Sequence, residues 1–271
     1  MKQEVLFHPE ADYFVPTSLA GSPWHPAMLH GGAPAGLLAY CLEQSVGNAA
    51  LQPARLSLDL IRPVPSAPLQ VVTRRIREGK RIVLEEGRLE AGGKTVAIAT
   101  ALFVQAQPVE IPETAPRRAP LEPLPHQLQP ISFRDVFFTD NPDMPPGLHT
   151  TVALKPITHM TESGQGRAWL SLPVPVVAGH GNSPFMLAAL MSDFCNGVGQ
   201  LKLAANTGMI NADIHLQLLR APVGEWIGID AQTLVQSGGI GMITAELHDL
   251  HGLIGQVNQT VMPTPEFKSG S

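Results

Sequence analysis

The apolar residues of the chain follow two different periods. Two segments, at about 33–47 and 184–204, are apolar on most faces and predict buried helices. Each is followed by four segments in which apolar and polar residues alternate, bounded by glycine-containing turns, which predicts antiparallel strands joined as hairpins. The strand segments of the first half are ARLSLDLIRPV, LQVVTRRIREG, RIVLEEGRLEAGG and KTVAIATALFVQ, and those of the second are ADIHLQLLRAPV, WIGIDAQTLVQSGG, GMITAELHDLHG and LIGQVNQTVMP.

The predicted strands of the two halves match at a constant separation. Leu58 and Leu216 lie 158 positions apart, and the same separation holds across two hairpins. Because chance periodicity does not keep one offset over so long a stretch, the sequence indicates an internal duplication. The other matching pairs are Leu60 with Leu218, Arg62 with Arg220 and Leu89 with Leu247.

A proline-rich segment separates the two halves. Residues 107–130 read QPVEIPETAPRRAPLEPLPHQLQP and contain almost no periodic apolar positions. Proline fixes φ and lacks an N–H donor, so this segment predicts a linker rather than a helix or a central strand. We therefore expect an N-terminal unit at 1–107, a linker at 108–130, a C-terminal unit at 131–265 and a polar tail at 266–271.

A long helix followed by a meander of strands buries its apolar area best when the sheet curls around the helix, and two such units can join edge to edge. Four motifs in this order, HGG, LSLDLIRPVP, MSDFCNGVG and VNQTVM, resemble the double-hotdog acyl-CoA thioesterases of the acyl-CoA thioesterase II type. The resemblance covers about residues 20–263. It implies an α+β tandem (double) hotdog, in which two long helices are each wrapped by a curved antiparallel sheet and the sheets form one continuous sheet.

The composition excludes several other classes of protein. Of the 271 residues, 44% are hydrophobic and 15% charged, so a large core can form. The net charge of -5 and the lack of a basic run argue against broad nucleic-acid binding. No apolar run reaches the roughly 18 residues of a membrane span, and the N-terminus lacks the apolar core of a secretory signal. The two cysteines are too few for a disulfide scaffold. Together, these features lead us to expect a cytoplasmic protein without membrane or nucleic-acid partners.

Asp193 interrupts a segment that is otherwise apolar. A buried carboxylate costs several kcal/mol unless it is paired or hydrated. Aligning Cys41 with Cys195 places Ala39 opposite Asp193, so the fold tolerates alanine at this place. The contrast favours a functional Asp193, although an aspartate satisfied by neighbouring groups would give the same pattern.

The resemblance implies that Asp193 belongs to a water-binding set with a glutamine and with a threonine or serine. Gln259 is the glutamine expected in the last strand, and Asn258 would replace it if a bulge shifted the register. At the threonine or serine position, the sequence has Asn211, which is a departure from the family. Asparagine can still donate and accept hydrogen bonds. The matching positions in the first half are not polar, so one active site per chain is expected.

The glycines that precede the first helix suggest a substrate-binding role. Gly31 and Gly32 let a ligand approach the backbone and leave N–H groups at the helix N-terminus, where they can polarise a thioester carbonyl. A tight turn against the sheet would explain them equally simply. His30 either assists in binding or caps the turn, and we do not expect it to be a base.

The remaining candidates for chemistry are weaker. Cys195 invites a thiol nucleophile, but Cys41 occupies the same place in the other half, so both are expected to be core residues. The spacing of His248 and His251 lacks further metal ligands. The segment TDNPDM (139–144) resembles part of a motif of hotdog enoyl hydratases but lacks its histidine, so a lyase ranks third.

We therefore expect an acyl-CoA thioesterase that hydrolyses a fatty or other hydrophobic acyl thioester by carboxylate-activated water, without a metal or organic cofactor. The alternative is a degenerate hotdog protein that binds acyl-CoA without turnover, which the asparagine at position 211 keeps open. The outer faces of the sheet and helices are compatible with a homo-oligomer.

Overall fold

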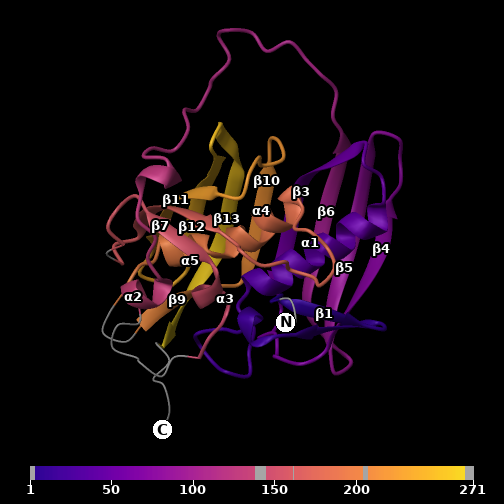
Figure 1. Ribbon diagram of the computed structural model, residues 1–271, viewed down its shortest axis with the longest axis horizontal. Coiled ribbons are helices and arrows are strands. Elements are labelled where there is room, and N and C mark those ends of the chain that lie inside the picture. Colours follow the sequence, from indigo (N-terminus) through magenta and orange to yellow (C-terminus); the bar gives the residue numbers. More distant parts are fainter. Residues whose placement is uncertain (1–3, 138–144, 161, 204–206, 266–271) are drawn as a thin grey trace.

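The computed structural model describes residues 4–137, 145–160, 162–203 and 207–265. The TDNPDM segment and the tail at 266–271 lie outside these residues. Within them, a single 13-stranded sheet is antiparallel in every ladder and accompanies few helices (Figure 1). None of these helices is long and apolar enough to cross a membrane.

Each predicted helix is followed by the four predicted strands. The elements of the first half are β1 (Phe7–Glu10), β2 (Tyr13–Pro16), η1 (Ser18–Ala20), α1 (Gly32–Val46), β3 (Leu51–Leu60), β4 (Leu69–Arg77), β5 (Ile82–Ala91) and β6 (Lys94–Gln105). Those that follow are η2 (Pro125–Gln127), α2 (Phe133–Phe137), α3 (Leu148–Thr151), β7 (Ala153–Pro156), β8 (Gln165–Ser171), α4 (Pro184–Asp193), α5 (Cys195–Val198), β9 (Thr207–Asn211), β10 (Asp213–Leu218), β11 (Ile227–Val235), β12 (Gly241–Asp249) and β13 (Gly252–Pro265).

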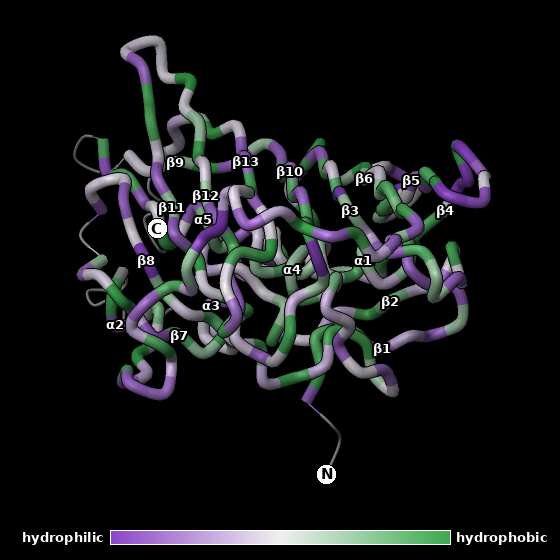
Figure 2. The backbone as a smooth tube through the Cα atoms, turned by 90° about the horizontal axis from the view of Figure 1, so that it is seen from above, coloured by the Kyte–Doolittle hydropathy of each residue, from purple (hydrophilic) through white to green (hydrophobic). Residues whose placement is uncertain are grey.

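The two halves share the sheet through β3 and β10. The strand order is β1-β2-β4-β5-β6-β3-β10-β13-β12-β11-β8-β7, and β9 pairs with β13. Leu56 pairs with Leu216 and Leu58 with Ile214 across the junction. Figure 2 shows the strands arranged around α1 and α4, which lie together in the middle of the molecule. The core therefore lies between the sheet and this pair of helices.

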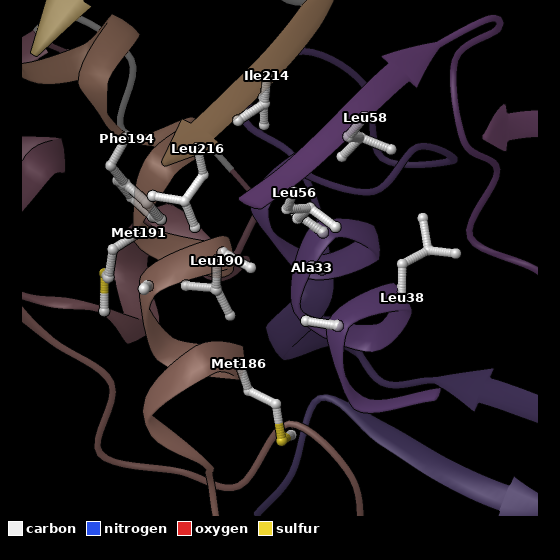
Figure 3. Packing of buried hydrophobic residues seen from close by; sticks show 14 of the residues in the cluster. Ala33, Leu38, Leu56, Leu58, Met186, Leu190, Met191, Phe194, Ile214 and Leu216 are labelled. Carbon is white, nitrogen blue, oxygen red and sulfur yellow. The ribbon is translucent and has the colours of Figure 1, made fainter. Parts of the chain in front are cut away.

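The two helices pack directly against each other. A Cβ atom added at Gly36 of α1 would lie 3.3 Å from Cδ1 of Leu190, so the glycine allows α4 to approach closely. Leu56, Ile214 and Leu216 of the central strands contact the same apolar cluster (Figure 3). This packing brings the end of α4 to the start of α1.

The second helix is shorter than predicted. Instead of extending over about 184–204, α4 ends at Asp193, and the short helix α5 follows Phe194. Within the last turn of α4, Ser192 Oγ donates a hydrogen bond of 2.7 Å to the carbonyl oxygen of Ala188, a contact that bends helices. Gly197 and Gly199 follow closely, and glycine weakens a helix. The break leaves Asp193 at a helix end.

The proline-rich segment crosses to the second half as a long arch (Figure 1) and contains only the short turn η2. Its carbonyl groups accept hydrogen bonds from the second half. Trp169 Nε1 donates to the oxygen of Pro123 at 2.9 Å, and Lys155 Nζ donates to that of Pro125 at 2.7 Å. The last part of the segment thus contacts β7 and β8.

Candidate active site

Asp193 is held by groups from three parts of the fold. The carboxylate is 6% exposed at the end of α4. Asn211 of β9 donates a hydrogen bond from Nδ2 to Oδ1 at 2.9 Å, and His30 Nδ1 lies 2.8 Å from Oδ2. Gly32 contributes its backbone N–H. With Gly31, which lies against the same carboxylate, the structure brings together five of the six residues singled out in the sequence.

These donors determine the charge of Asp193. Burial raises the pKa of the carboxyl group, but the hydrogen bonds from His30, Asn211 and Gly32 outweigh burial, so the pKa of Asp193 lies below its usual value. Asp193 is consequently ionised at neutral pH. An ionised carboxylate in this position can accept a proton from water.

The contact with Asp193 selects one tautomer of His30. A 2.8 Å distance between His30 Nδ1 and a carboxylate oxygen requires a proton on Nδ1, which leaves Nε2 as an acceptor in the neutral ring. The backbone N of Gly32 lies 3.2 Å from the same Nδ1 atom, but a nitrogen that carries a proton is a poor acceptor. The N–H of Gly32 therefore donates to the carboxylate of Asp193. The imidazole also stacks on Phe194, with 4.7 Å between ring centroids. Both contacts fix the ring orientation.

The two glycines bring the start of α1 against α4. A Cβ atom at Gly31 would lie 2.7 Å from Oδ1 of Asp193, and one at Gly32 would lie 2.8 Å from the carbonyl oxygen of Leu190. The glycines therefore face α4, not a turn against the sheet. The N–H of Gly32 is used by Asp193, whereas that of Gly31 has no backbone acceptor among the described residues.

A cavity of about 430 Å³ opens onto this group. His30, Gly31, Asp193 and Asn211 all line it. Its remaining lining is mostly apolar and comes from both halves of the chain. The cavity is large enough for a substrate group to reach Asp193.

Gln259 lies behind the cavity and is not part of its lining. Its side chain is buried in β13, and Nε2 donates a hydrogen bond of 2.9 Å to the carbonyl oxygen of Ser192. Oε1 has no hydrogen-bond partner among the described residues. Asn258, the alternative in the sequence, is exposed on the other face of the strand. Gln259 thus contacts the backbone next to Asp193 rather than Asp193 itself.

Comparison with known proteins identifies the family. The N-terminal domain model of the acyl-CoA thioesterases matches residues 20–104, and the C-terminal domain model matches residues 112–262. The chain belongs to the acyl-CoA thioesterase family. This thioesterase is accordingly a thioester hydrolase. A search of curated proteins finds no match.

Solved structures place the thioesterase among hotdog proteins. An acyl-CoA thioesterase II, TesB2, from Mycobacterium marinum is 18% identical with a TM-score of 0.64, covering 99% of this chain and 96% of that chain. A hot dog fold protein of unknown function from Alicyclobacillus acidocaldarius is 14% identical with a TM-score of 0.70, covering 95% of each chain. The tesB protein of Mycobacterium avium subsp. paratuberculosis is 14% identical with a TM-score of 0.64, covering 96% of each.

The thioesterase cavity also contains residues that the sequence did not indicate. Phe133 of α2 and His149 of α3 both line it and are buried. Burial lowers the pKa of His149 to about 3, and the nearby His30 adds to the effect, so His149 is neutral at pH 7. An isolated histidine and phenylalanine in a segment without periodicity carry no signal that would have identified them.

The residues that correspond to Gly31 and Asp193 in the thioesterase are apolar and buried. Cys41 and Cys195 lie 154 positions apart, and at this offset Phe185 corresponds to Gly31, as Asp193 corresponds to Ala39. Phe185 and Ala39 are fully buried, and Phe185 packs edge-on against Phe103 with 5.9 Å between centroids. The start of α4 therefore has a buried aromatic side chain where the start of α1 has glycine.

The cysteines and the HDLH segment show no reactive arrangement. Burial raises the pKa of Cys41 to about 12 and also raises that of Cys195, so neither is a thiolate at neutral pH. His248 is buried beside Glu246 at the β12–β13 hairpin. In the part of the chain that the structure describes, no group of three or more His, Cys, Asp or Glu side chains is placed to hold a metal ion.

Proposed function

We propose that the protein hydrolyses fatty or other hydrophobic acyl-CoA thioesters with Asp193 as general base. The observation that carries this proposal is the buried carboxylate of Asp193, which hydrogen bonds keep ionised where the end of α4 and the start of α1 meet a mostly apolar cavity. In the proposed reaction, Asp193 accepts a proton from water while the water oxygen bonds to the thioester carbon. The tetrahedral intermediate then collapses, the C–S bond breaks, and the CoA thiolate takes up the proton that Asp193 accepted, which regenerates the carboxylate.

The other site residues would support this step. The N–H of Gly31, near the positive end of α1, is suited to stabilise the negative charge that develops on the carbonyl oxygen. Asn211 and His30 hold the carboxylate in one orientation. Gln259 supports the last turn of α4, and its unpaired Oε1 is a site for a buried water beside that turn.

The fold supports a single such site in a tandem hotdog. We assign one hotdog to residues 1–107, with α1 as its helix, and the other to 131–265, with α4 and α5, joined by the linker at 108–130. Phe185 and Ala39, the buried apolar residues that correspond to Gly31 and Asp193, agree with one catalytic centre per chain. The alternative function is acyl-CoA binding without turnover. The observation that favours it is Asn211, which stands where the family is expected to have a threonine or serine.

Release of free thiol from a panel of acyl-CoAs, from short to long acyl chains, tests the proposed function. We expect turnover of at least part of the panel, with a preference for apolar acyl groups. If none is hydrolysed while one of them raises the melting temperature, the protein is a binder and the proposed reaction is wrong.

A further inference from the structure

The lining of the cavity has an exposed side and a buried side. Trp24, Ile61 and Met262 are 38%, 45% and 50% exposed and form the rim. Phe133 and Phe194 are 3% and 2% exposed and form a closed wall. A ligand that reaches Asp193 from solvent therefore has an open path on one side and an apolar barrier on the other.

This asymmetry orients an acyl-CoA, given the function proposed above. The phosphates of CoA are too costly to transfer into an apolar cavity, so they must remain at the rim. The rim also contains Arg62, which is the only lysine or arginine among the described lining residues. With the thioester carbon at Asp193 and the CoA arm toward Arg62, the acyl chain extends toward the buried wall.

Phe133 closes that wall. Its ring lies against Phe194 with 5.3 Å between centroids and a tilt of 41°. It also contacts α5, where a Cβ atom at Gly197 would lie 3.3 Å from its Cε1 atom. Gly197 also lines the cavity. The absence of a side chain at Gly197 thus lets the Phe133 ring fill space that would otherwise extend the cavity along α5.

We infer that Phe133 limits the length of the acyl chain that this enzyme accepts. The residue comes from α2, which lies between the linker and β7 and is not one of the helix and strand segments that the two halves share. Chain-length preference is accordingly set from outside the helix and strands that carry Asp193, Asn211 and Gln259. Phe194 stacks on His30, whereas Phe133 contacts Phe194 and is one ring further from Asp193. A substitution of Phe133 therefore alters the end of the cavity without removing a contact to His30 or Asp193.

Replacing Phe133 by leucine and by alanine tests the inference. Each methylene newly accommodated should increase kcat/KM about fourfold, because burying a CH₂ contributes ~0.8 kcal/mol and 1.36 kcal/mol corresponds to tenfold. We expect Phe133→Leu and then Phe133→Ala to shift the best substrate to progressively longer acyl chains. Phe103→Leu, a change of a buried phenylalanine that packs on Phe185 away from the cavity, should leave the profile in place.

The outcomes separate this inference from the proposed function. If the parent hydrolyses no acyl-CoA, the proposed function fails. If the parent is active and Phe133→Leu is folded, with a cooperative melting transition, but has the parent's chain-length profile, Phe133 does not limit the acyl chain. A uniform loss of activity at all chain lengths would also contradict the inference, because it would indicate a purely structural role.

Discussion

A methyl group at position 31 should separate the start of α1 from Asp193. The backbone of Gly31 has φ -57° and ψ -28°, which alanine adopts without strain, so Gly31→Ala acts only through its Cβ atom. That atom would lie 2.7 Å from Oδ1 of Asp193, and an ordinary contact begins at 3.4 Å. Asp193 or α1 must therefore move by about 0.7 Å. A catalytic group displaced by 1 Å can lose about 100-fold in rate, so a shift of this size should be measurable.

The same contact determines the cost in stability. Overpacking of this kind destabilises by roughly 1–3 kcal/mol, and each kcal/mol lowers Tm by about 2–4 °C in a chain of this size. We expect Gly31→Ala to lower kcat/KM by about one to two decades. The same substitution should reduce the free energy of unfolding by roughly 1–3 kcal/mol. Gly181→Ala, at an exposed glycine with no atom within 4 Å of an added Cβ, is the matched control and should change stability by less than about 0.5 kcal/mol.

A double-mutant cycle identifies the cause. In an Asp193→Ala background the carboxylate is gone, so adding Gly31→Ala should cost less than about 0.5 kcal/mol more. Urea unfolding of the four proteins measures the coupling directly. If Gly31→Ala destabilises equally in both backgrounds, the close approach to Asp193 is not the reason for the glycine, and the argument above is wrong.

Two further predictions concern the buried histidine and the asparagine. The pKa of His149 is about 3 in the folded protein, whereas an ordinary histidine has a pKa of about 6.5. Between these two pH values, the unfolded state binds a proton at His149 that the native state does not. The free energy of unfolding of the parent should therefore fall as the pH falls through this window, by up to about 1.4 kcal/mol per pH unit. Urea unfolding of His149→Gln should show a weaker dependence of this free energy on pH. Equal pH dependence in the two proteins would contradict this prediction. Asn211→Ala removes a donor that lowers the pKa of Asp193, so the acid limb of the pH dependence of kcat/KM should move to higher pH, and an unmoved limb would remove that hydrogen bond from the account.

The periodic parts of the chain were predictable because periodicity reflects burial. The apolar segment at about 33–47 became α1, and alternation identified eight of the thirteen strands, β3–β6 and β10–β13. The end of α4 at Asp193 was not predictable in this way. The features found near this end are a side-chain hydrogen bond from Ser192 and two glycines, and neither changes the apolar pattern.

The site was predictable where the two halves differ. Asp193 stood out against Ala39, and the structure places Asn211 and His30 in contact with it. The direction of the Gly32 N–H and the position of Gln259 behind the cavity were not predictable, because they depend on how closely the helices approach. Phe133 and His149 come from a segment without repeat or period, and only its folded path brings them to the cavity.

The central claim is that Asp193 activates the attacking water, and Asp193→Asn tests it most directly. The amide keeps the shape of the side chain but cannot accept the proton, so kcat/KM for the parent's best acyl-CoA should fall by about two to four decades. Cys195→Ala, two residues further along and also buried, should stay within about twofold and controls for packing near the helix end. Turnover of Asp193→Asn within about twofold of the parent, with both proteins folded, would exclude Asp193 as the base.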